Sequence, residues 1–366
     1  MKIVQIIFGL SSGGAERFVV DLSNELEKNH EVIVLTLKDD NVDGNNFYLP
    51  ELSKNVKYIN AGIKKGFSLK DAFFLYKTIK TISPDIVHFH LTNVVFYIFF
   101  SILFYRKPKY VETLHIQADK MNTKKIQIQI KYWLYRLKFV KLCTISNDNQ
   151  RSFIKSFKIK DSALIYNGRS KPLPSGKINT VKLEIENLKK TPNDIVFLHI
   201  GRCAEQKNQK MLISVFNRLS SQGINFILLI IGDKFDSKLG SELKMLACDN
   251  IHFLGTRLNI TDYYLNSDGF CLSSIFEGMP ITLIEAFACG CIPISTPTSG
   301  ATDIIDNQVT GYVSSNNDEE SYYQSIMSFI AERETINKLD LIRYYEENLS
   351  MPYCAERYVR FYNSMK

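Results

Sequence analysis

The sequence lacks several features that would place the chain in common classes of protein. None of its seven cysteines forms a Cys-x-x-Cys pair, and no two aspartates are separated by a single residue. The longest apolar run, at 94–105, contains 12 residues, whereas a helix needs about 20 residues to cross a bilayer. We therefore expect free thiols in a reducing compartment and no transmembrane segment.

The amino-terminal residues MKIVQIIFGLSSGGAE do not have the form of a signal peptide either. Their short apolar stretch leads into glycines instead of a cleavage site. We therefore expect a cytoplasmic protein. Its 366 residues, of which 45% are hydrophobic and 23% charged, are typical of a globular chain with two domains.

Positive charge is concentrated in the first half of the chain. Residues 1–170 contain 26 Lys and Arg against 15 Asp and Glu, whereas the remainder contains 19 against 23. A basic half indicates an anionic partner, which could be a nucleic acid, a phosphate-bearing ligand or a membrane surface.

Apolar segments of the first half alternate in the order of an α/β domain, which implies a parallel sheet. The segment IYNGRSKPLPSGK, at 165–177, interrupts this alternation and is rich in Gly, Pro, Ser and Lys, so we interpret it as a linker. Strands are expected at 2–8, 30–37, 85–90, 110–115 and 141–146, and helices at 15–26, 69–82, 94–105 and 122–138.

The alternation starts again after the linker. The fold class is therefore predicted as α/β, with two Rossmann-like domains that face each other across a cleft. Residues 1–170 and 171–345 would form the domains, and a final helix within 346–366 would pack back on the first. Strands of the second domain are expected at 194–201, 225–232, 251–255, 269–274 and 292–296, and helices at 208–222, 238–247 and 260–266.

The stretch SSIFEGMPITLIEAFACG, at 273–290, contains the strongest functional signal. Gly278 and Pro280 disfavour an earlier helix, so the predicted helix begins at about Pro280 and ends before Gly290. The amide groups of residues 281–283 would then have no partner within the helix. They would form an anion site at its positive end.

Two acids flank the start of this helix. Glu277 lies in the loop before it, and Glu285 lies one to two turns inside. A carboxylate inside the helix could accept hydrogen bonds from a ribose, and one on the loop could meet a sugar beyond the phosphates. The alternative is two solvated surface acids, but the surrounding residues are apolar, and a buried acid without a partner is costly.

The segment GRCAEQKNQ contains two cations after the first predicted strand of the second domain. Arg202 can bind phosphate oxygens through two parallel hydrogen bonds, and Lys207 adds a point charge. In isolation these residues would be an ordinary surface pair. At the carboxyl end of a parallel strand, however, they would face the crevice in which such sheets bind ligands.

Three weaker signals lie in the first half. The segment GLSSGGAE is not the Gly-x-Gly-x-x-Gly fingerprint of dinucleotide binding, so Gly13 and Gly14 form either a ligand-facing turn or an ordinary loop. His115 follows a strand and is either structural or directed at a ligand. His88 and His90 alternate on one strand and would face the same side, as structural or acceptor-side residues.

Together these segments resemble the group-1 type, family 4 retaining glycosyltransferases, which have the GT-B fold. The resemblance extends over nearly the whole chain and is most specific in EGMPITLIEAFACGCIPIST. The EGMP form is similar to members that build bacterial capsule, O-antigen or exopolysaccharide. The segments that carry the resemblance to the family are GGAERFVVDLSNEL, DIVHFH, ETLH, IYNG, GRCAEQKN and EGMPITLIEAFACGCIPIST.

The resemblance implies a role for each candidate residue. Glu277 and His115 are the expected catalytic residues, because both would face the transferred sugar. Arg202 and Lys207 would bind the donor pyrophosphate, and Glu285 would hold the ribose. The residues expected to complete the donor site are Gly278, Met279, Pro280, Ile281, Thr282, Leu283, Gly13 and Gly14.

The implied reaction moves a sugar from a nucleoside diphosphate, with UDP preferred, to a hydroxyl of a glycan or polyprenyl-diphosphate-linked acceptor, with retention of configuration. Without an Asp-x-Asp pair to chelate a metal, no metal or other cofactor is expected. The alternative is a non-catalytic subunit of the same fold that supports a partner transferase. The intact candidate acids and bases argue against it.

The segment 106–141 contains ten Lys and Arg and two acids, interleaved with aromatic and apolar residues. It is either a solvated helix face next to a core helix or a peripheral contact with an anionic membrane. No nucleic acid is expected as a partner, because the basic residues form no helix-turn-helix or zinc-finger motif. The interleaved residues are Tyr132, Trp133, Leu134, Tyr135 and Leu137.

Overall fold

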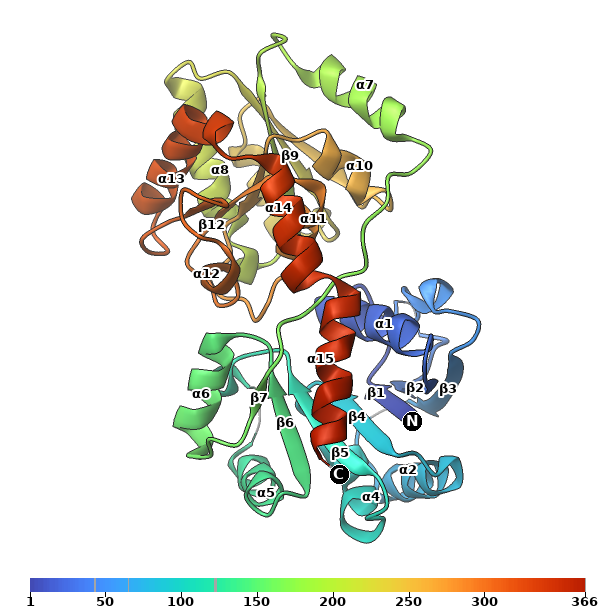
Figure 1. The fold of residues 1–366 in the computed structure, drawn as a ribbon. Helices are drawn as coiled ribbons and strands as arrows, with labels where there is room; N and C mark the ends of the chain where they lie inside the picture. The colour runs from blue at the N-terminus through green and yellow to red at the C-terminus, as the bar shows by residue number, and fades with distance from the viewer. Residues whose placement is uncertain (43, 65, 122–123, 366) are drawn as a thin grey trace. The chain divides into compact units, whose positions relative to one another are not determined.

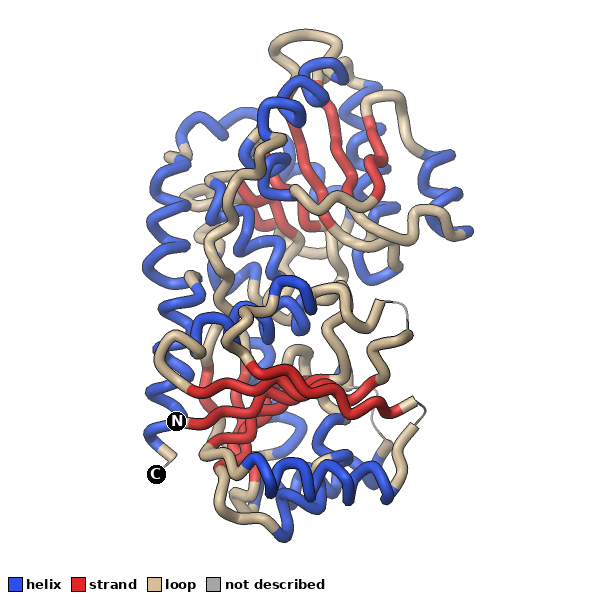
Figure 2. The backbone as a smooth tube through the Cα atoms, turned by 90° about the vertical axis from the view of Figure 1, so that its right-hand side faces the viewer, coloured by secondary structure: helices blue, strands red, loops and turns tan. Residues whose placement is uncertain are grey.

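The computed structural model describes residues 1–42, 44–64, 66–121 and 124–365 and contains two compact units (Figure 1). Unit 1 consists of Met1–Ser170 and Leu349–Lys366, and unit 2 of Lys171–Asn348. The chain thus passes from unit 1 to unit 2 within the segment that the sequence predicts as a linker. Helices flank the strands of each sheet (Figure 2).

Unit 1 contains a parallel sheet in the order β3-β2-β1-β4-β5-β6-β7. The strands are β1 (Lys2–Ile7), β2 (Glu31–Lys38), β3 (Lys57–Ile63), β4 (Ile86–His90), β5 (Lys109–Leu114), β6 (Val140–Thr144) and β7 (Ala163–Leu164). The helices are α1 (Gly14–Leu26), α2 (Leu69–Ile82), α3 (Val94–Tyr97), α4 (Phe99–Phe104), α5 (Lys125–Arg136), α6 (Asn147–Phe157) and α15 (Met351–Ser364).

The two faces of this sheet differ in chemistry, because successive side chains of a strand point to opposite faces. One face packs in an apolar core with α2, α4, α5 and α6. The other face meets α1 and α15 and contains buried polar side chains. These are Gln5, His88, His90 and Thr113.

Unit 2 contains a second parallel sheet, in the order β10-β9-β8-β11-β12-β13. The strands are β8 (Ile195–Ile200), β9 (Phe226–Ile231), β10 (Ile251–Gly255), β11 (Gly269–Leu272), β12 (Ile292–Ser295) and β13 (Tyr312–Val313). The helices are α7 (Ile178–Leu188), α8 (Gln209–Ser221), α9 (Lys238–Leu246), α10 (Ile260–Leu265), α11 (Ile281–Cys289), α12 (Ala301–Ile304), α13 (Glu319–Glu332) and α14 (Lys338–Tyr344).

The predicted α/β class with two Rossmann-like sheets is confirmed, but the single helix predicted over 94–105 is wrong. It is divided into α3 and α4 at Ile98, whose φ of −100° and ψ of 11° are not helical. Apolar composition alone predicted one continuous helix there, and it does not report such a break.

The seven cysteines are all free thiols, as predicted, and six of them are buried. Within the part of the chain that the structure describes, no helix combines the length and the apolar character needed to cross a bilayer.

Candidate active site

The predicted residues of unit 2 lie where the strand order of its sheet reverses. β8 and β11 are neighbours, whereas β9 and β10 lie on one side of the pair and β12 and β13 on the other. In open parallel sheets, ligands bind beyond the carboxyl ends of strands at this position. The loop after β8 contains Arg202 and Lys207, and the loop after β11 contains Glu277.

Hydrogen bonds hold the two loops together. The Ser273 hydroxyl donates to the Lys207 carbonyl at 2.8 Å. The Ile275 amide donates to the Gln206 carbonyl at 2.8 Å, and the Gln206 side-chain amide donates to the Phe276 carbonyl at 2.8 Å. The backbone on both sides of the reversal is therefore fixed before a ligand binds.

These bonds place Lys207 opposite Glu277. The Lys207 Nζ lies 2.7 Å from Oε1 of Glu277, and the two side chains are 17% and 11% exposed. The sequence predicted separate roles for this cation and this acid, and the structure brings them into direct contact. The ammonium expected at a phosphate is already paired with the carboxylate expected at the sugar.

Arg202 is the more exposed of the two cations. Its side chain is exposed, and no ion pair involves it among the residues that the structure describes. Its carbonyl accepts a hydrogen bond from the Gln209 side-chain amide at 2.9 Å. Gly201, the residue before Arg202, lies close to Gly232, which follows β9. A Cβ on Gly232 would collide with the Gly201 carbonyl.

The start of α11 differs in detail from the prediction. Pro280 is the N-cap residue and not the first helical residue, and its carbonyl accepts hydrogen bonds from the amides of Leu283 at 3.1 Å and Ile284 at 3.4 Å. The expectation of an unpartnered amide at Leu283 was therefore wrong. In the described part of the chain, the amides of Ile281 and Thr282 have no backbone acceptor.

Gly300 lies directly against the loop that precedes α11. Gly300 has a φ of +77°, and a Cβ there would lie 2.7 Å from the Gly278 carbonyl oxygen and 2.9 Å from Cα of Met279. Only a glycine satisfies both the backbone angle and this close approach. α11 ends as predicted, at Gly290 with a φ of +66°.

Glu285 is more enclosed than its predicted contact with a ribose suggests. The residue is 4% exposed. The hydroxyl of Tyr264 lies 3.4 Å from Oε2 of Glu285 and donates to the Thr282 carbonyl at 2.8 Å. The carboxylate is therefore held against α10 and α11.

Three predicted residues belong to unit 1 and lie at the carboxyl edge of its sheet. Gly13 is the N-cap of α1, Gly14 begins it, and His115 directly follows β5. His115 is partly exposed and its Nε2 lies 3.1 Å from Nδ1 of the buried His90. Burial lowers the pKa of His115 to about 3, so the ring is neutral at physiological pH.

The sequence missed the side chains that surround His115. His90 Nε2 lies 2.8 Å from Oε1 of Gln5, on β1. The alternation in VHFH predicted that His88 and His90 share a face, and this is confirmed by rings whose centroids are 4.1 Å apart. Nothing in the local sequence indicated Gln5, because its partner is 85 residues away.

The segment 106–141, interpreted as a solvated helix face next to a core helix or as a membrane contact, contains a buried ion pair that the sequence did not indicate. Lys131 is fully buried, and its Nζ contacts Oε1 of Glu112 at 2.5 Å. Tyr135 is also buried and donates to the same carboxylate at 2.7 Å. Trp133 and Leu137 are 55% and 58% exposed, so α5 contributes one face to the core and another to solvent.

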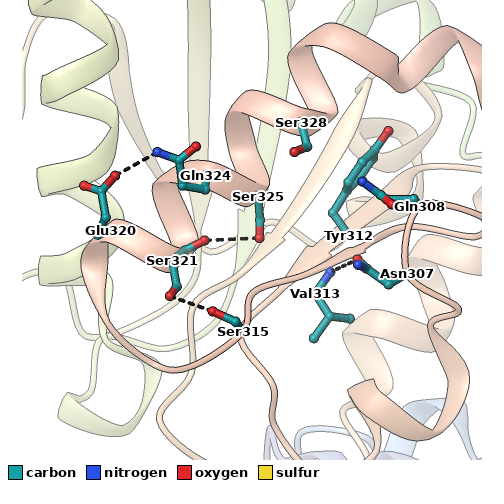
Figure 3. Close-up of a pocket in the computed structure, with 10 residues that line it drawn as sticks. All are labelled: Asn307, Gln308, Tyr312, Val313, Ser315, Glu320, Ser321, Gln324, Ser325 and Ser328. Atoms are coloured by element: carbon teal, nitrogen blue, oxygen red, sulfur yellow. Dashed lines mark hydrogen bonds between the residues drawn. The ribbon is translucent and has the colours of Figure 1, made fainter.

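A separate polar pocket of about 260 Å³ lies beside β13 and α13 in unit 2 (Figure 3). Hydroxyl and amide groups line it, including those of Ser321, Gln324 and Ser325. It contains none of the predicted site residues. Across the described residues, no group of three or more His, Cys, Asp or Glu is arranged to hold a metal ion.

Both units are open α/β domains with parallel sheets. Solved structures share this fold. The structure of HepE from Anabaena in complex with UDP and glucose aligns with a TM-score of 0.79 at 17% identity, over 100% of both chains. A glycosyltransferase from Rickettsia africae aligns with a TM-score of 0.82 at 21% identity, over 99% of this chain and 98% of that one.

Sequence comparison gives the family. The model described as Glycosyltransferase Family 4 matches residues 12–170, and the one described as Glycosyl transferases group 1 matches residues 181–344. The chain therefore belongs to the group 1 and family 4 glycosyltransferases and has the GT-B fold.

Two relatives have similar lengths. The UDP-Gal:alpha-D-GlcNAc-diphosphoundecaprenol alpha-1,3-galactosyltransferase of Escherichia coli is 26% identical over 296 residues, which cover 77% of this chain and 73% of the relative. The capsular polysaccharide biosynthesis glycosyltransferase CapH of Staphylococcus aureus is 26% identical over 310 residues, or 81% of each chain.

Proposed function

We propose that this glycosyltransferase moves a sugar from a UDP-sugar to a hydroxyl of a glycan or of a polyprenyl-diphosphate-linked oligosaccharide in the synthesis of a surface polysaccharide. The name of the Escherichia coli relative supports a lipid-linked acceptor, and that of the Staphylococcus aureus relative supports synthesis of a surface polysaccharide. The single observation that carries the proposal is the pair of loops after β8 and β11, which place Arg202, Lys207 and Glu277 at the strand reversal.

The donor diphosphate would occupy the space beside Arg202, Lys207 and the first amides of α11. The exposed guanidinium of Arg202 offers two parallel hydrogen bonds to phosphate oxygens. The amides of Ile281 and Thr282 add donors at the positive end of the helix. Positive groups that are already in place stabilise the charge that develops on the departing diphosphate.

This arrangement supports catalysis without a metal ion. Two cations and a helix end can neutralise the leaving group, which is the role of a divalent cation in metal-dependent transferases. Activity that survives EDTA supports the proposal, whereas activity lost in EDTA and restored by Mg²⁺ contradicts it.

We also propose that the configuration at the anomeric carbon is retained, with attack on the face from which the diphosphate leaves. Glu277, paired with Lys207, would stabilise positive charge on the sugar. A covalent intermediate on Glu277 is the less favoured route, because its carboxylate is engaged by an ammonium. NMR analysis of the product anomer decides between retention and inversion.

A lipid-linked acceptor would place the enzyme at the cytoplasmic face of a membrane. The exposed residues of α5 and its two ends include Trp133, Leu137, Lys124, Lys125 and Arg136, a composition that suits a peripheral contact with anionic headgroups. Sedimentation with phosphatidylglycerol vesicles that weakens with salt is expected. Equal sedimentation with phosphatidylcholine vesicles contradicts it.

The central test is a panel of nucleoside diphosphate sugars assayed for hydrolysis and then for transfer to polyprenyl-diphosphate-linked saccharides. Purified chain that hydrolyses one UDP-sugar supports catalysis by this chain alone. A chain inactive with every donor would favour a supporting, non-catalytic subunit.

Arg202→Ala sharpens this test. We expect UDP affinity to fall about 10- to 100-fold, because hydrogen bonds to charged groups contribute about 1.5–3 kcal/mol. Uridine, which lacks the phosphates, should bind both proteins equally. Lys210→Ala, an exposed cation on α8, is the matched control and should leave UDP binding unchanged.

A further inference from the structure

A row of polar side chains begins at the partly exposed His115 and continues through the buried His90 and Gln5 of unit 1. His115 Nε2 lies 3.1 Å from His90 Nδ1, and His90 Nε2 lies 2.8 Å from Gln5 Oε1. On the same face, His88 contacts the hydroxyls of Tyr362 and Thr113 at 2.7 Å each. The strands β1, β4 and β5 are adjacent in the sheet, which brings these residues together.

The orientation of one amide sets the protons along this row. A carbonyl oxygen can only accept, so Nε2 of His90 donates to Gln5. A neutral imidazole carries one N–H, so Nδ1 of His90 must accept, and the proton between the rings belongs to Nε2 of His115. The remaining nitrogen of His115, Nδ1, then has a lone pair.

The hydrogen bonds of His88 are compatible with this direction. Nε2 of Gln5 is buried and has no hydrogen-bond partner among the described residues. Tyr362 can donate to Nδ1 of His88, whose Nε2 donates to Thr113. Burial lowers the pKa values of His88 and His90 well below the ordinary value, which keeps both rings neutral.

Packing fixes the ring of His115 as well as its proton. Phe18, on the second turn of α1, contacts it edge to face with ring centroids 5.6 Å apart, and also packs against His90 at 6.0 Å. His115 is itself partly exposed, at the carboxyl edge of the sheet and close in the sheet order to the loop that contains Gly13 and Gly14.

We propose that Gln5 and His90 are positioning residues that hold His115 in the Nε2–H tautomer, so that Nδ1 accepts a hydrogen bond from a hydroxyl of the sugar substrate. This inference rests on the proposed function for its ligand. In this role the ring of His115 is neutral, and it accepts a hydrogen bond from the substrate instead of donating one. A hydroxyl, which can donate, is therefore recognised at this position, and a group that can only accept is rejected.

The tautomer is measured directly by NMR on the full chain labelled with ¹⁵N at histidine. The chain has six histidines, and His115→Asn identifies the signals of His115. We expect the ¹⁵N signals of the His115 ring to show that Nε2 carries a proton and that Nδ1 does not. A protonated Nδ1 overturns the inference, and this measurement requires no substituted protein beyond the one used for assignment.

Gln5→Met tests the relay, since methionine has nearly the same shape but accepts no comparable hydrogen bond. We expect a mixture of His115 tautomers and a fall in kcat of about three- to tenfold, the range for the loss of one hydrogen bond. UDP affinity should stay within about twofold, because the expected phosphate contacts are in unit 2. An unchanged tautomer in Gln5→Met contradicts the relay.

Thr113→Val is the matched control. It removes a buried hydroxyl from the same face of the same sheet, where Thr113 bonds to His88 and Tyr358, but it does not touch the row from His115 to Gln5. The His115 tautomer and kcat should remain close to those of the wild type. Equal losses of kcat in the two variants would indicate a purely structural role and overturn the proposal.

The two proposals fail in different ways. A wild-type chain that is inactive with every nucleotide sugar overturns the proposed function, while NMR still decides where the proton lies. An active chain with a protonated Nδ1 on His115 overturns only the inference.

Discussion

Lys207 and Glu277 form an ion pair across the strand reversal of unit 2, with Nζ donating to Oε1 at 2.7 Å. Each residue would be costly to hold without the other, because both side chains are largely buried. A diphosphate that approaches Lys207 must share it with Glu277. In the proposed donor site, the acid would therefore weaken the attraction for the phosphate while supplying negative charge near the transferred sugar.

Glu277→Ala should separate these two effects. Turnover is expected to fall about 10²-fold or more, as when one preorganised electrostatic group of an active site is removed. UDP should bind at least as tightly, because Lys207 no longer has a competing partner. Steady-state kinetics and calorimetry with UDP measure the two quantities.

Glu205→Ala is the control for this substitution. Glu205 is an exposed acid two residues before Lys207, and we expect its loss to leave turnover nearly unchanged. Near-normal turnover in Glu277→Ala would remove Glu277 from the catalytic site, and weaker UDP binding would contradict its competition for Lys207.

A second prediction concerns the glycine beneath the Glu277 loop. Gly300→Ala would place a Cβ 2.7 Å from the Gly278 carbonyl oxygen, so the loop must move. Gly223, with a φ of +74° and no atom near its missing Cβ, is the matched position. Both alanines should cost about 1–2 kcal/mol of unfolding free energy because of positive φ, but only Gly300→Ala should also lower kcat, by about tenfold or more.

Unfolding and kinetics on the two glycine variants check this prediction. Equal kcat values in Gly300→Ala and Gly223→Ala would show that the loop tolerates the displacement. A fall in kcat in Gly223→Ala as well would point to a general loss of folded protein.

The same loop shows how far the sequence could predict the site. The glycine, proline and helix pattern of 273–290 placed α11 within one residue, because those residue types act locally on the backbone. The contact between Lys207 and Glu277, the support from Gly300 and the row from His115 to Gln5 join residues that are far apart in the chain. Local patterns do not report which of these distant residues meet.

The buried triad of Glu112, Lys131 and Tyr135 is the clearest case of such a contact. The sequence left 106–141 as a solvated helix face or a membrane contact and did not single out Lys131, which is fully buried and bonded to Glu112. Burial raises the pKa of Glu112 and lowers the pKa of Lys131. Without its partner, either group would be a buried charge in an apolar core.

Lys131→Met should therefore lower the unfolding free energy of unit 1 by about 3–5 kcal/mol. Glu112→Leu combined with Lys131→Met should recover at least half of this loss, because no buried charge remains. Urea unfolding followed by the fluorescence of Trp133, the only tryptophan, reports on α5 directly.

Lys125→Met is the control for this pair. Lys125 is exposed on the same helix, and its substitution should change the unfolding free energy by no more than about 0.5 kcal/mol. A double variant that is less stable than Lys131→Met alone would mean that Tyr135, and not the charge of Glu112, dominates the triad.

Three histidines of unit 1, the buried His88 and His90 and the partly exposed His115, predict a loss of stability in mild acid. Burial lowers the pKa values of His88 and His90, and lowers that of His115 to about 3, whereas in the unfolded chain each is about 6.5. As the pH falls below about 6.5, the unfolded state binds protons that the native state does not. Stability therefore falls from that pH downward, and for His115 the fall continues to about pH 3.

At pH 5.5 each of these histidines should lower the unfolding free energy by about 1.4 kcal/mol, and the three together by about 4 kcal/mol, relative to pH 7.5. Urea unfolding followed by Trp133 at the two pH values measures the difference. His88→Gln should reduce it by about a third, whatever its effect on stability at pH 7.5. A free energy that stays constant between these pH values would mean that the histidines take up protons in the folded protein, and the neutral row from His115 to Gln5 could not then persist.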